Sequence, residues 1–338
     1  MRRSPNVYIV LLALMPLLFI GNIAYGAVSI PLPLLWDVIA GNGEAPQAFS
    51  VIITGSRIPQ ALTALLSGAA LAVSGLLLQT FFRNPLAGPS ILGISDGANL
   101  GVAIVMLCGV GAVSSFGGYM AVVFSALAGA LTILAVIIYF SKKVRSNVML
   151  LIIGMMTGYM VSSAISVLNY YASADKVRQF VMWGMGDFSS VSLQKLPYFS
   201  AFLISGLAGA VMLIKPLNAL LLGDANARSL GINVRRTRLA VLLCTGVMTA
   251  VVTAFCGPIS FIGLAVPHVA RLLCGTSDHR RLVPVTILCG ACVALLCNML
   301  TVVPGSGAVL PLNAVTPLLG APVIIYVIVN KRNIQYFD

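Results

Sequence analysis

The side chains that could carry acid–base or metal chemistry are few in this sequence, and their spacing suits neither. Eight carboxylates and two histidines are spread over 338 residues. The sequence contains no H-E-x-x-H motif, no histidine pair, no aspartate cluster and no G-x-x-x-x-G-K-[ST] loop for nucleotide phosphates. An enzyme working inside a membrane would lack a catalytic group here. We therefore expect this chain to bind no metal and no other cofactor.

Seven cysteines lie in or at the ends of apolar stretches, and Cys289 and Cys292 form a C-x-x-C pair. Such a pair can bind zinc or act in redox chemistry when a second pair of ligands or a suitable fold accompanies it. The second pair is missing, and the surrounding segment is apolar. We expect these thiols to pack as small buried side chains.

The elements that must position these groups are helices in a lipid environment. The sequence is 59% hydrophobic and only 8% charged, with a mean hydropathy of +1.03. A helix needs about 20 mostly apolar residues to cross the hydrocarbon core, and the charge-poor stretches hold ten such segments. The sequence therefore predicts an all-α polytopic membrane protein with one transmembrane domain, residues 1–338. Its expected spans are 6–27, 58–80, 91–109, 118–140, 148–170, 196–214, 239–256, 259–275, 282–302 and 309–330.

Basic residues indicate the orientation, because Lys and Arg near span ends are retained in the cytoplasm. With the N-terminus inside, ten spans leave only Arg57, Lys176, Arg178 and Lys195 of the 20 basic residues on the outer side. Both termini are then cytoplasmic, and topology explains the net charge of +12 without nucleic acid. The first span resembles a signal peptide, but its apolar run continues to Trp36, so we expect an uncleaved anchor.

Charge inside a membrane is expensive and usually marks an ion or proton path. Seven of the eight acidic residues fall in polar connections, and Asp96 is expected near the cytoplasmic start of its span. This distribution weakens the case for an ion-coupled secondary transporter, although backbone carbonyls could still bind sodium. Without a nucleotide-binding loop in the chain, transport against a gradient would need energy from a cytoplasmic partner.

The most polar cytoplasmic connection, residues 215–238, is suited to receive such a partner. We expect short amphipathic helices there, broken at Gly223 and Gly231, with Asp224 to Arg228 helical and a left-handed stop at Gly231. A short helix on the membrane surface can enter a partner's groove and pass on a rigid-body push. The alternative is a solvated positive-inside loop without a partner, and the residues alone leave both open.

Two segments far apart in the sequence resemble each other. Gly88-Pro89 is followed by Gly93, and Gly257-Pro258 is followed by Gly263 at nearly the same spacing. The expected topology gives these segments opposite orientations, which is the pattern of an inverted repeat in a transporter. Gly-Pro turns between apolar helices are also common without any repeat, so the inverted repeat is a hypothesis.

Several motifs occur in a fixed order from about residue 50 to the C-terminus. They are Arg57-Ile58-Pro59, Gly68-Ala69-Ala70-Leu71-Ala72-Val73-Ser74-Gly75, Arg83-Asn84-Pro85-Leu86-Ala87, Trp183-Gly184-Met185-Gly186, Leu222-Gly223-Asp224, Gly257-Pro258-Ile259-Ser260-Phe261-Ile262-Gly263, Pro267-His268-Val269-Ala270-Arg271 and Gly320-Ala321-Pro322. Together they resemble the FecCD family, the membrane permeases of bacterial ABC importers for iron-siderophores, haem and cobalamin.

The resemblance implies a permease that is not itself an enzyme. It implies ten spans, a second permease in a homodimer, two cytoplasmic ABC ATPases that bind ATP and Mg, and a periplasmic binding protein. The complex would carry an iron-siderophore, haem or cobalamin-type chelate across the bacterial inner membrane from periplasm to cytoplasm. The alternative function is that of an ion-coupled secondary transporter. Nothing in the sequence selects one chelate or shows whether the partner permease is identical.

The resemblance also implies roles for particular residues. An ATPase contact at about 217–232 implies coupling residues Leu222, Gly223, Asp224, Ala227, Arg228 and Gly231. A path lined by about 148–185 and 309–328 implies Met155, Met156, Tyr159, Asn169 and Tyr170. A basic outer face that docks the binding protein implies Arg57, Lys176 and Arg178, with plain loop charges as the alternative. The structural motif residues are Asn84, Pro85, Gly93, Gly257, Pro258, Gly263, Pro267, His268 and Arg271.

This sequence departs from the family pattern after Pro59, where the family often has a second arginine and this chain has Gln60. If that arginine meets the binding protein, docking differs here. His268 could ligate haem iron, but we expect a packed, hydrogen-bonded residue. Arg271 is expected to reach the interface or to pair locally, with Asp96 as a candidate partner.

Overall fold

The chain is almost entirely helical in the residues that the computed structural model describes, which are 4–26, 28, 30–40, 46–109, 116–144, 146–303 and 308–329. The one β-type contact in these ranges is an isolated bridge between Val302 and Val309. The helices are α1 (Ser4–Ala24), α2 (Leu32–Ala40), α3 (Gln47–Ile52), the π-helix η1 (Ile53–Arg57), α4 (Ile58–Phe82), the 3-10 helix η2 (Pro89–Leu92), α5 (Ile94–Cys108), α6 (Phe116–Lys143), α7 (Asn147–Tyr171), α8 (Ala174–Gly184), α9 (Leu196–Met212), α10 (Ile214–Leu221), α11 (Asp224–Ser229), α12 (Val234–Cys256), α13 (Ile262–Cys274), α14 (His279–Leu300) and α15 (Leu312–Val329).

Six of the described helices are long and apolar enough to cross a membrane: α1, the continuous run from α3 through α4, α6, α7, α12 and α14. The pair α9 and α10, bent by 48°, makes up to a seventh, and α5, α13 and α15 are apolar but shorter. Each of the ten ranges expected from the sequence coincides with one of these helices. The chain is a multi-pass membrane protein, as its composition predicts.

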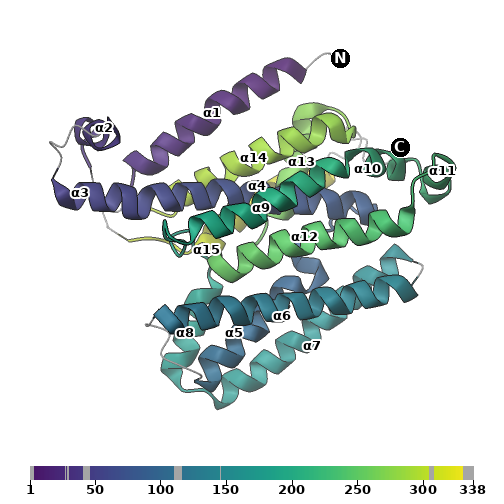
Figure 1. The fold of residues 1–338 in the computed structure, drawn as a ribbon, viewed down its shortest axis with the longest axis horizontal. Coiled ribbons are helices and arrows are strands. Elements are labelled where there is room, and N and C mark those ends of the chain that lie inside the picture. The colour runs from purple at the N-terminus through teal and green to yellow at the C-terminus, as the bar shows by residue number, and fades with distance from the viewer. Residues whose placement is uncertain are drawn as a thin grey trace.

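Helix α4 lies at the centre of the bundle (Figure 1). It packs against α14, α12, α13 and α9, while α1 lies along α14. Helices α5, α6, α7 and α8 gather on the side of α12 that faces away from α14 (Figure 1). Every residue of α4 from Ser67 to Phe82 is buried, which fits a helix that is apolar on all sides.

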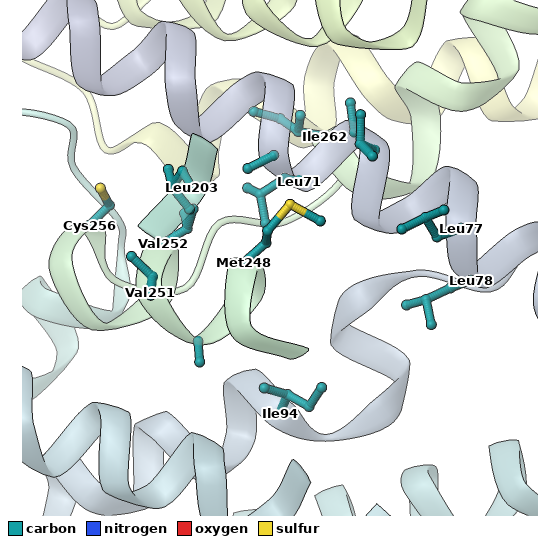
Figure 2. Close-up of a cluster of buried hydrophobic side chains, with 14 of the residues drawn as sticks. Leu71, Leu77, Leu78, Ile94, Leu203, Met248, Val251, Val252, Cys256 and Ile262 are labelled. Carbon is teal, nitrogen blue, oxygen red and sulfur yellow. The ribbon is translucent and has the colours of Figure 1, made fainter. Parts of the chain in front are cut away.

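The core around α4 is formed by side chains from most of the helices of the bundle. Figure 2 shows Leu71, Leu77 and Leu78 of α4 with Ile94 of α5, Leu203 of α9, Ile262 of α13, and Met248, Val251, Val252 and Cys256 of α12. Cys289, Cys292 and Cys297 of α14 belong to the same core, so four of the seven free thiols are buried as small apolar side chains. The remaining three are partly or fully exposed.

The helices α5 and α13 are short and begin inside the bundle. With 15 and 13 residues, they are about 22 and 20 Å long, less than the hydrocarbon thickness of about 30 Å. At the start of α13, Gly263 lies so close to Gly75 of α4 that a Cβ on Gly75 would collide with the Gly263 carbonyl oxygen. A Cβ on Gly263 would in turn lie 2.7 Å from Pro89 of η2. The two Gly-Pro segments that resemble each other in sequence therefore meet beside the C-terminal half of α4.

Two helical regions were not predicted. Helix α2 lies in the stretch after the first span, and α3 with η1 extends α4 by 11 residues towards its N-terminal side. The extension includes Thr54 and Ser56, which are weak helix formers. Because the predicted span begins after the charge of Arg57, it starts 11 residues later than the helix does.

Candidate functional site

The segment 215–238 is a compact platform of three helical pieces, and from here on we call it the platform. Helix α10 ends at Leu221, α11 covers Asp224–Ser229, and α12 begins at Val234. The breaks fall at Gly223 and Gly231, whose φ angles of +103° and +79° favour glycine. This arrangement matches the one expected from the sequence.

The platform has its own small apolar core and an exposed apolar surface. Ala219, Leu220, Ala227 and Val234 are buried together, with Ile232 packed against them. Leu222 and Leu230 are instead about 60% exposed on either side of α11. Of the predicted coupling residues, Ala227 thus holds the platform together, whereas Leu222, Asp224 and Arg228 are available at its surface.

Arg83 fastens the platform to the end of α4. It caps α4 in the left-handed conformation, with φ +47°. Its Nη2 donates a hydrogen bond of 2.6 Å to the carbonyl oxygen of Leu220 in the last turn of α10. The same nitrogen lies 4.0 Å from the Asp224 carboxylate at the start of α11. One side chain therefore contacts two of the three helical pieces of the platform, α10 and α11.

A second set of hydrogen bonds joins the same end of α4 to α7 and α12. Asn147, the first residue of α7, donates from Nδ2 to the Phe81 carbonyl oxygen at 2.9 Å. Arg238 of α12 donates to Asn147 Oδ1 at 2.7 Å, and its guanidinium lies over the Phe81 ring. The C-terminal end of α4 is thus tied to the start of α7 and to the first turns of α12.

Helix α13 is tied to α4 and to the turn that follows it. His268 is 1% exposed, and its Nε2 lies 2.8 Å from the Pro85 carbonyl oxygen. Arg271 donates to Gln79 Oε1 at 2.5 Å, and Gln79 Nε2 donates to the Leu264 carbonyl oxygen. These contacts support the packed, hydrogen-bonded role expected for His268 and make Gln79 the local partner of Arg271.

Asp96 lies in the first turn of α5, near the start of its helix as the sequence predicted. Its carboxylate packs against Gly158, where a Cβ would be 2.6 Å from Oδ2. Gly158 is halfway along α7, so the start of α5 lies beside the middle of α7 and not beside its end. The reason is that η2 and the turn before it carry the chain back along α4 before α5 begins, and a count of residues between charges cannot show such a return.

The predicted path residues share one face of α7. At about 100° per residue, Met155, Met156, Tyr159, Asn169 and Tyr170 fall within an arc of about 140°. Four of them are between 38% and 83% exposed, and Asn169 is partly buried. Gly154 and Gly158 lie outside this arc, on the buried side of α7 against η2 and α5. Helix α7 therefore presents a continuous Met- and Tyr-rich surface outside the bundle.

The structure assigns Arg57 a different role from the docking that was predicted. Its side chain is only 6% exposed. The guanidinium donates to the carbonyl oxygens of Ile23 at 2.7 Å and Ala24 at 2.9 Å, and to that of Val28. Arg57 thus caps the C-terminal end of α1, where a cation is favourable. A side chain enclosed in this way has a structural role, and the geometry gives no support to docking by Arg57.

Lys176 and Arg178 remain at the surface on α8. They line a cavity of about 900 Å³ that also includes Asp175, Tyr119 and Trp183. Arg178 is exposed, and Lys176 is partly buried and donates to the Leu107 carbonyl oxygen at 3.4 Å.

Arg83 and Asn147 were not predicted as site residues, although both connect the platform region to α4. The available signal was their position: a lone cation or amide at the boundary between an apolar span and a polar turn. Their partners are backbone oxygens 66 to 137 residues away, and no local pattern identifies those.

Comparisons with known proteins cover nearly the whole length. The sequence matches the FecCD transport family over residues 12–330. The vitamin B12 import system permease protein BtuC of Klebsiella pneumoniae is 38% identical over 265 residues, which cover 78% of each chain. The protein of the same name from Citrobacter koseri is 38% identical over 269 residues, covering 78% of this chain and 79% of that one.

A solved structure has the same arrangement of helices. It shows an inward-facing conformation of a transporter assigned to the metal-chelate type of ABC transporters. The TM-score is 0.84 at 29% sequence identity, and the superposition covers 96% of this chain and 99% of the other. With a family match that runs from within α1 to the end of α15, this chain belongs to the FecCD transport family.

Proposed function

We propose that this chain is the membrane-spanning permease subunit of a bacterial ABC importer, driven by ATP hydrolysis on a separate protein. The observation that carries the proposal is the platform: an exposed apolar and charged surface on α11, fastened by Arg83 to the central helix of the bundle. A movement of α11 driven by a bound ATPase would be transmitted to α4 through this contact. The names of the relatives, a vitamin B12 import permease and a metal-chelate type ABC transporter, support the same function.

The complex would contain a second, identical permease. It would also contain two cytoplasmic ABC ATPases, which bind ATP and Mg, and a periplasmic binding protein. Ten spans in the inner membrane account best for the helices: six long ones, the bent pair α9–α10, and the shorter α5, α13 and α15. With an even number of spans, both termini lie on the same side of the membrane. Because Lys and Arg near span ends are retained in the cytoplasm, this side and the platform are cytoplasmic. The meeting of the two Gly-Pro segments beside α4 supports an inverted repeat.

The cargo would be a bulky metal chelate of the iron-siderophore, haem or cobalamin kind. The Met- and Tyr-rich face of α7, with α8 and α15, would line the path between two permeases, because this face is left uncovered by the rest of the chain. Lys176 and Arg178 would meet acidic residues of the binding protein, since Arg178 is exposed beside the α8 cavity.

Reconstitution tests this function directly. The chain is purified with its ATPase, placed in proteoliposomes with the binding protein, and supplied with radiolabelled cobalamin, haem or ferric siderophore. Uptake should require ATP and an ATPase with an intact nucleotide site. Uptake driven by a proton or sodium gradient, with a catalytically inactive ATPase, would establish an ion-coupled transporter instead. Comparison of the labelled chelates identifies the cargo.

A further inference from the structure

The first residue of α14, His279, is buried where α4, α10 and α14 meet. Its side chain is 1% exposed, although it directly follows a polar turn. The imidazole lies between Asn218 of α10 and Thr80 of α4. Asn218 falls within the range 217–232 of the implied ATPase contact, but none of the three is among the six named coupling residues, and each comes from a different helix.

The orientation of the Asn218 amide follows from its neighbours. The backbone N–H of His279 can only donate, and it points at one amide atom of Asn218 at 2.9 Å, so that atom is the oxygen Oδ1. The amide nitrogen then donates to the Asp278 carboxylate at 2.6 Å. Asp278 is also the N-cap of α14 and accepts from the backbone N–H of Arg280 at 3.0 Å. Asn218 therefore binds the start of α14 twice, through the backbone N–H of His279 and through the carboxylate of Asp278.

The protonation of the imidazole follows in turn. Because His279 Nδ1 lies 2.7 Å from the same Asn218 oxygen, Nδ1 carries a proton and donates. The other ring nitrogen, Nε2, lies 2.8 Å from Thr80 Oγ1. In the neutral imidazole Nε2 accepts from the Thr80 hydroxyl, whose proton also faces the Leu76 carbonyl oxygen at 3.0 Å. A chain of directional hydrogen bonds thus runs from α10 through His279 into the last turns of α4.

We infer that Asn218, His279 and Thr80 are positioning residues that make α10 move together with the cytoplasmic ends of α4 and α14. The inference rests on the proposed function, because it describes how a push from an ATPase enters the membrane helices. Apolar contacts alone would let α10 slide over α4 with little change in energy. Hydrogen bonds to a fixed imidazole are lost by such a slide, and in a buried site no water replaces them. These hydrogen bonds therefore oppose sliding of α10 over α4, so that movement of α10 driven by the ATPase also moves α4 and α14.

The test uses the complete complex in proteoliposomes and measures ATP hydrolysed per cargo molecule transported. Thr80→Val keeps the shape and removes only the hydroxyl. His279→Asn retains a donor near the Nδ1 position but no longer reaches Thr80. The matched control is Thr286→Val on α14, since Thr286 is also fully buried and its hydroxyl donates only to the Leu282 carbonyl oxygen of its own helix.

Loss of a neutral buried hydrogen bond is worth about 0.5–1.5 kcal/mol, so we expect Thr80→Val and His279→Asn to raise the ATP consumed per cargo by roughly two- to tenfold. The double variant should be no worse than either single one, because both remove the same contact. ATPase co-purification should stay at the wild-type level. An equal loss of hydrolysis and uptake, or a ratio no different from that of Thr286→Val, would overturn the inference and leave a purely structural contact. If the wild-type complex itself shows no ATP-dependent uptake, the proposed function fails first, and this outcome is distinguishable from the others.

Discussion

Arg83 at the end of α4 and Leu220 in the last turn of α10 are joined by a hydrogen bond of 2.6 Å between the guanidinium and the backbone carbonyl. The carbonyls of a helix's last turn have no partner within the helix, so Arg83 supplies one from the central helix of the bundle. The contact thus joins the C-terminal ends of α4 and α10 directly.

Replacing Arg83 should separate ATP hydrolysis from transport. A hydrogen bond to a charged group is worth about 1.5–3 kcal/mol, so Arg83→Ala should lower uptake by roughly tenfold or more, while the ATPase still co-purifies through the surface of α11. Arg83→Lys keeps the charge near Asp224 and should retain part of the activity. Equal uptake by wild-type and Arg83→Ala in proteoliposomes would show that force does not pass through this residue.

Gly231 should be needed for the shape of the platform. A Cβ there meets open space, but the φ of +79° costs an L-residue about 1–2 kcal/mol. We expect Gly231→Val to weaken ATPase co-purification. Gly275 is the matched control, since it also has a positive φ of +61° and open surroundings, but caps α13 outside the platform. Equal effects of Gly231→Val and Gly275→Val would point to general strain and against an ATPase contact.

Arg57→Ala should impair folding and leave docking intact. Three backbone carbonyls at the end of α1 would lose their donor, at a cost of about 2–3 kcal/mol. The melting temperature of the purified protein in detergent should fall, and Arg57→Lys should recover only part of the loss because an ammonium lacks the planar fork. Protein that survives purification should bind the binding protein with unchanged affinity.

Reversing the charge of Arg178 on α8 should weaken docking and leave stability unchanged. Arg178 is exposed, so Arg178→Glu should leave the melting temperature unchanged while lowering the association rate with an acidic binding protein. Raising the salt concentration should shrink the difference between wild type and variant. Association kinetics that are identical at low salt would remove Arg178 from the docking surface.

Gly75→Ala should disrupt the crossing of α4 and α13. In an open helix this change stabilises by about 1 kcal/mol, but here the new methyl group would collide with the Gly263 carbonyl oxygen. We expect a lower yield of folded protein and a lower melting temperature. Gly55→Ala serves as the comparison, because its nearest contact is Val51 at 4.0 Å. A Gly75→Ala protein as stable as Gly55→Ala would mean that the two backbones can separate without cost.

The sequence predicted the helices well because apolar length and charge gaps are local properties. All ten expected ranges coincide with helices, and the glycine breaks of the platform fall at Gly223 and Gly231 as expected. The membership of the FecCD family was likewise recognisable from ordered motifs. These features depend on residues close together in the chain.

The failures concern contacts between distant residues. Arg57 was assigned to docking because a cation in an outer loop is usually solvated, but its partners lie about 30 residues earlier at the end of α1. Asp96 does lie near the start of its helix as predicted, but a hydropathy profile could not show that the chain turns back before α5 and brings this start beside the middle of α7. Asn218 and His279 gave no signal at all, because an amide and an imidazole acquire a role only when three helices bring them together.

The uninterrupted helical run from Gln47 to Phe82 has a mechanical consequence. Its 36 residues make a rod about 54 Å long, well beyond the hydrocarbon thickness of about 30 Å, so it projects into water. A tilt of about one degree shifts the far tip by roughly 1 Å over such a length. A slight tilt of this helical run at one end therefore displaces the other end without any loop having to transmit the movement.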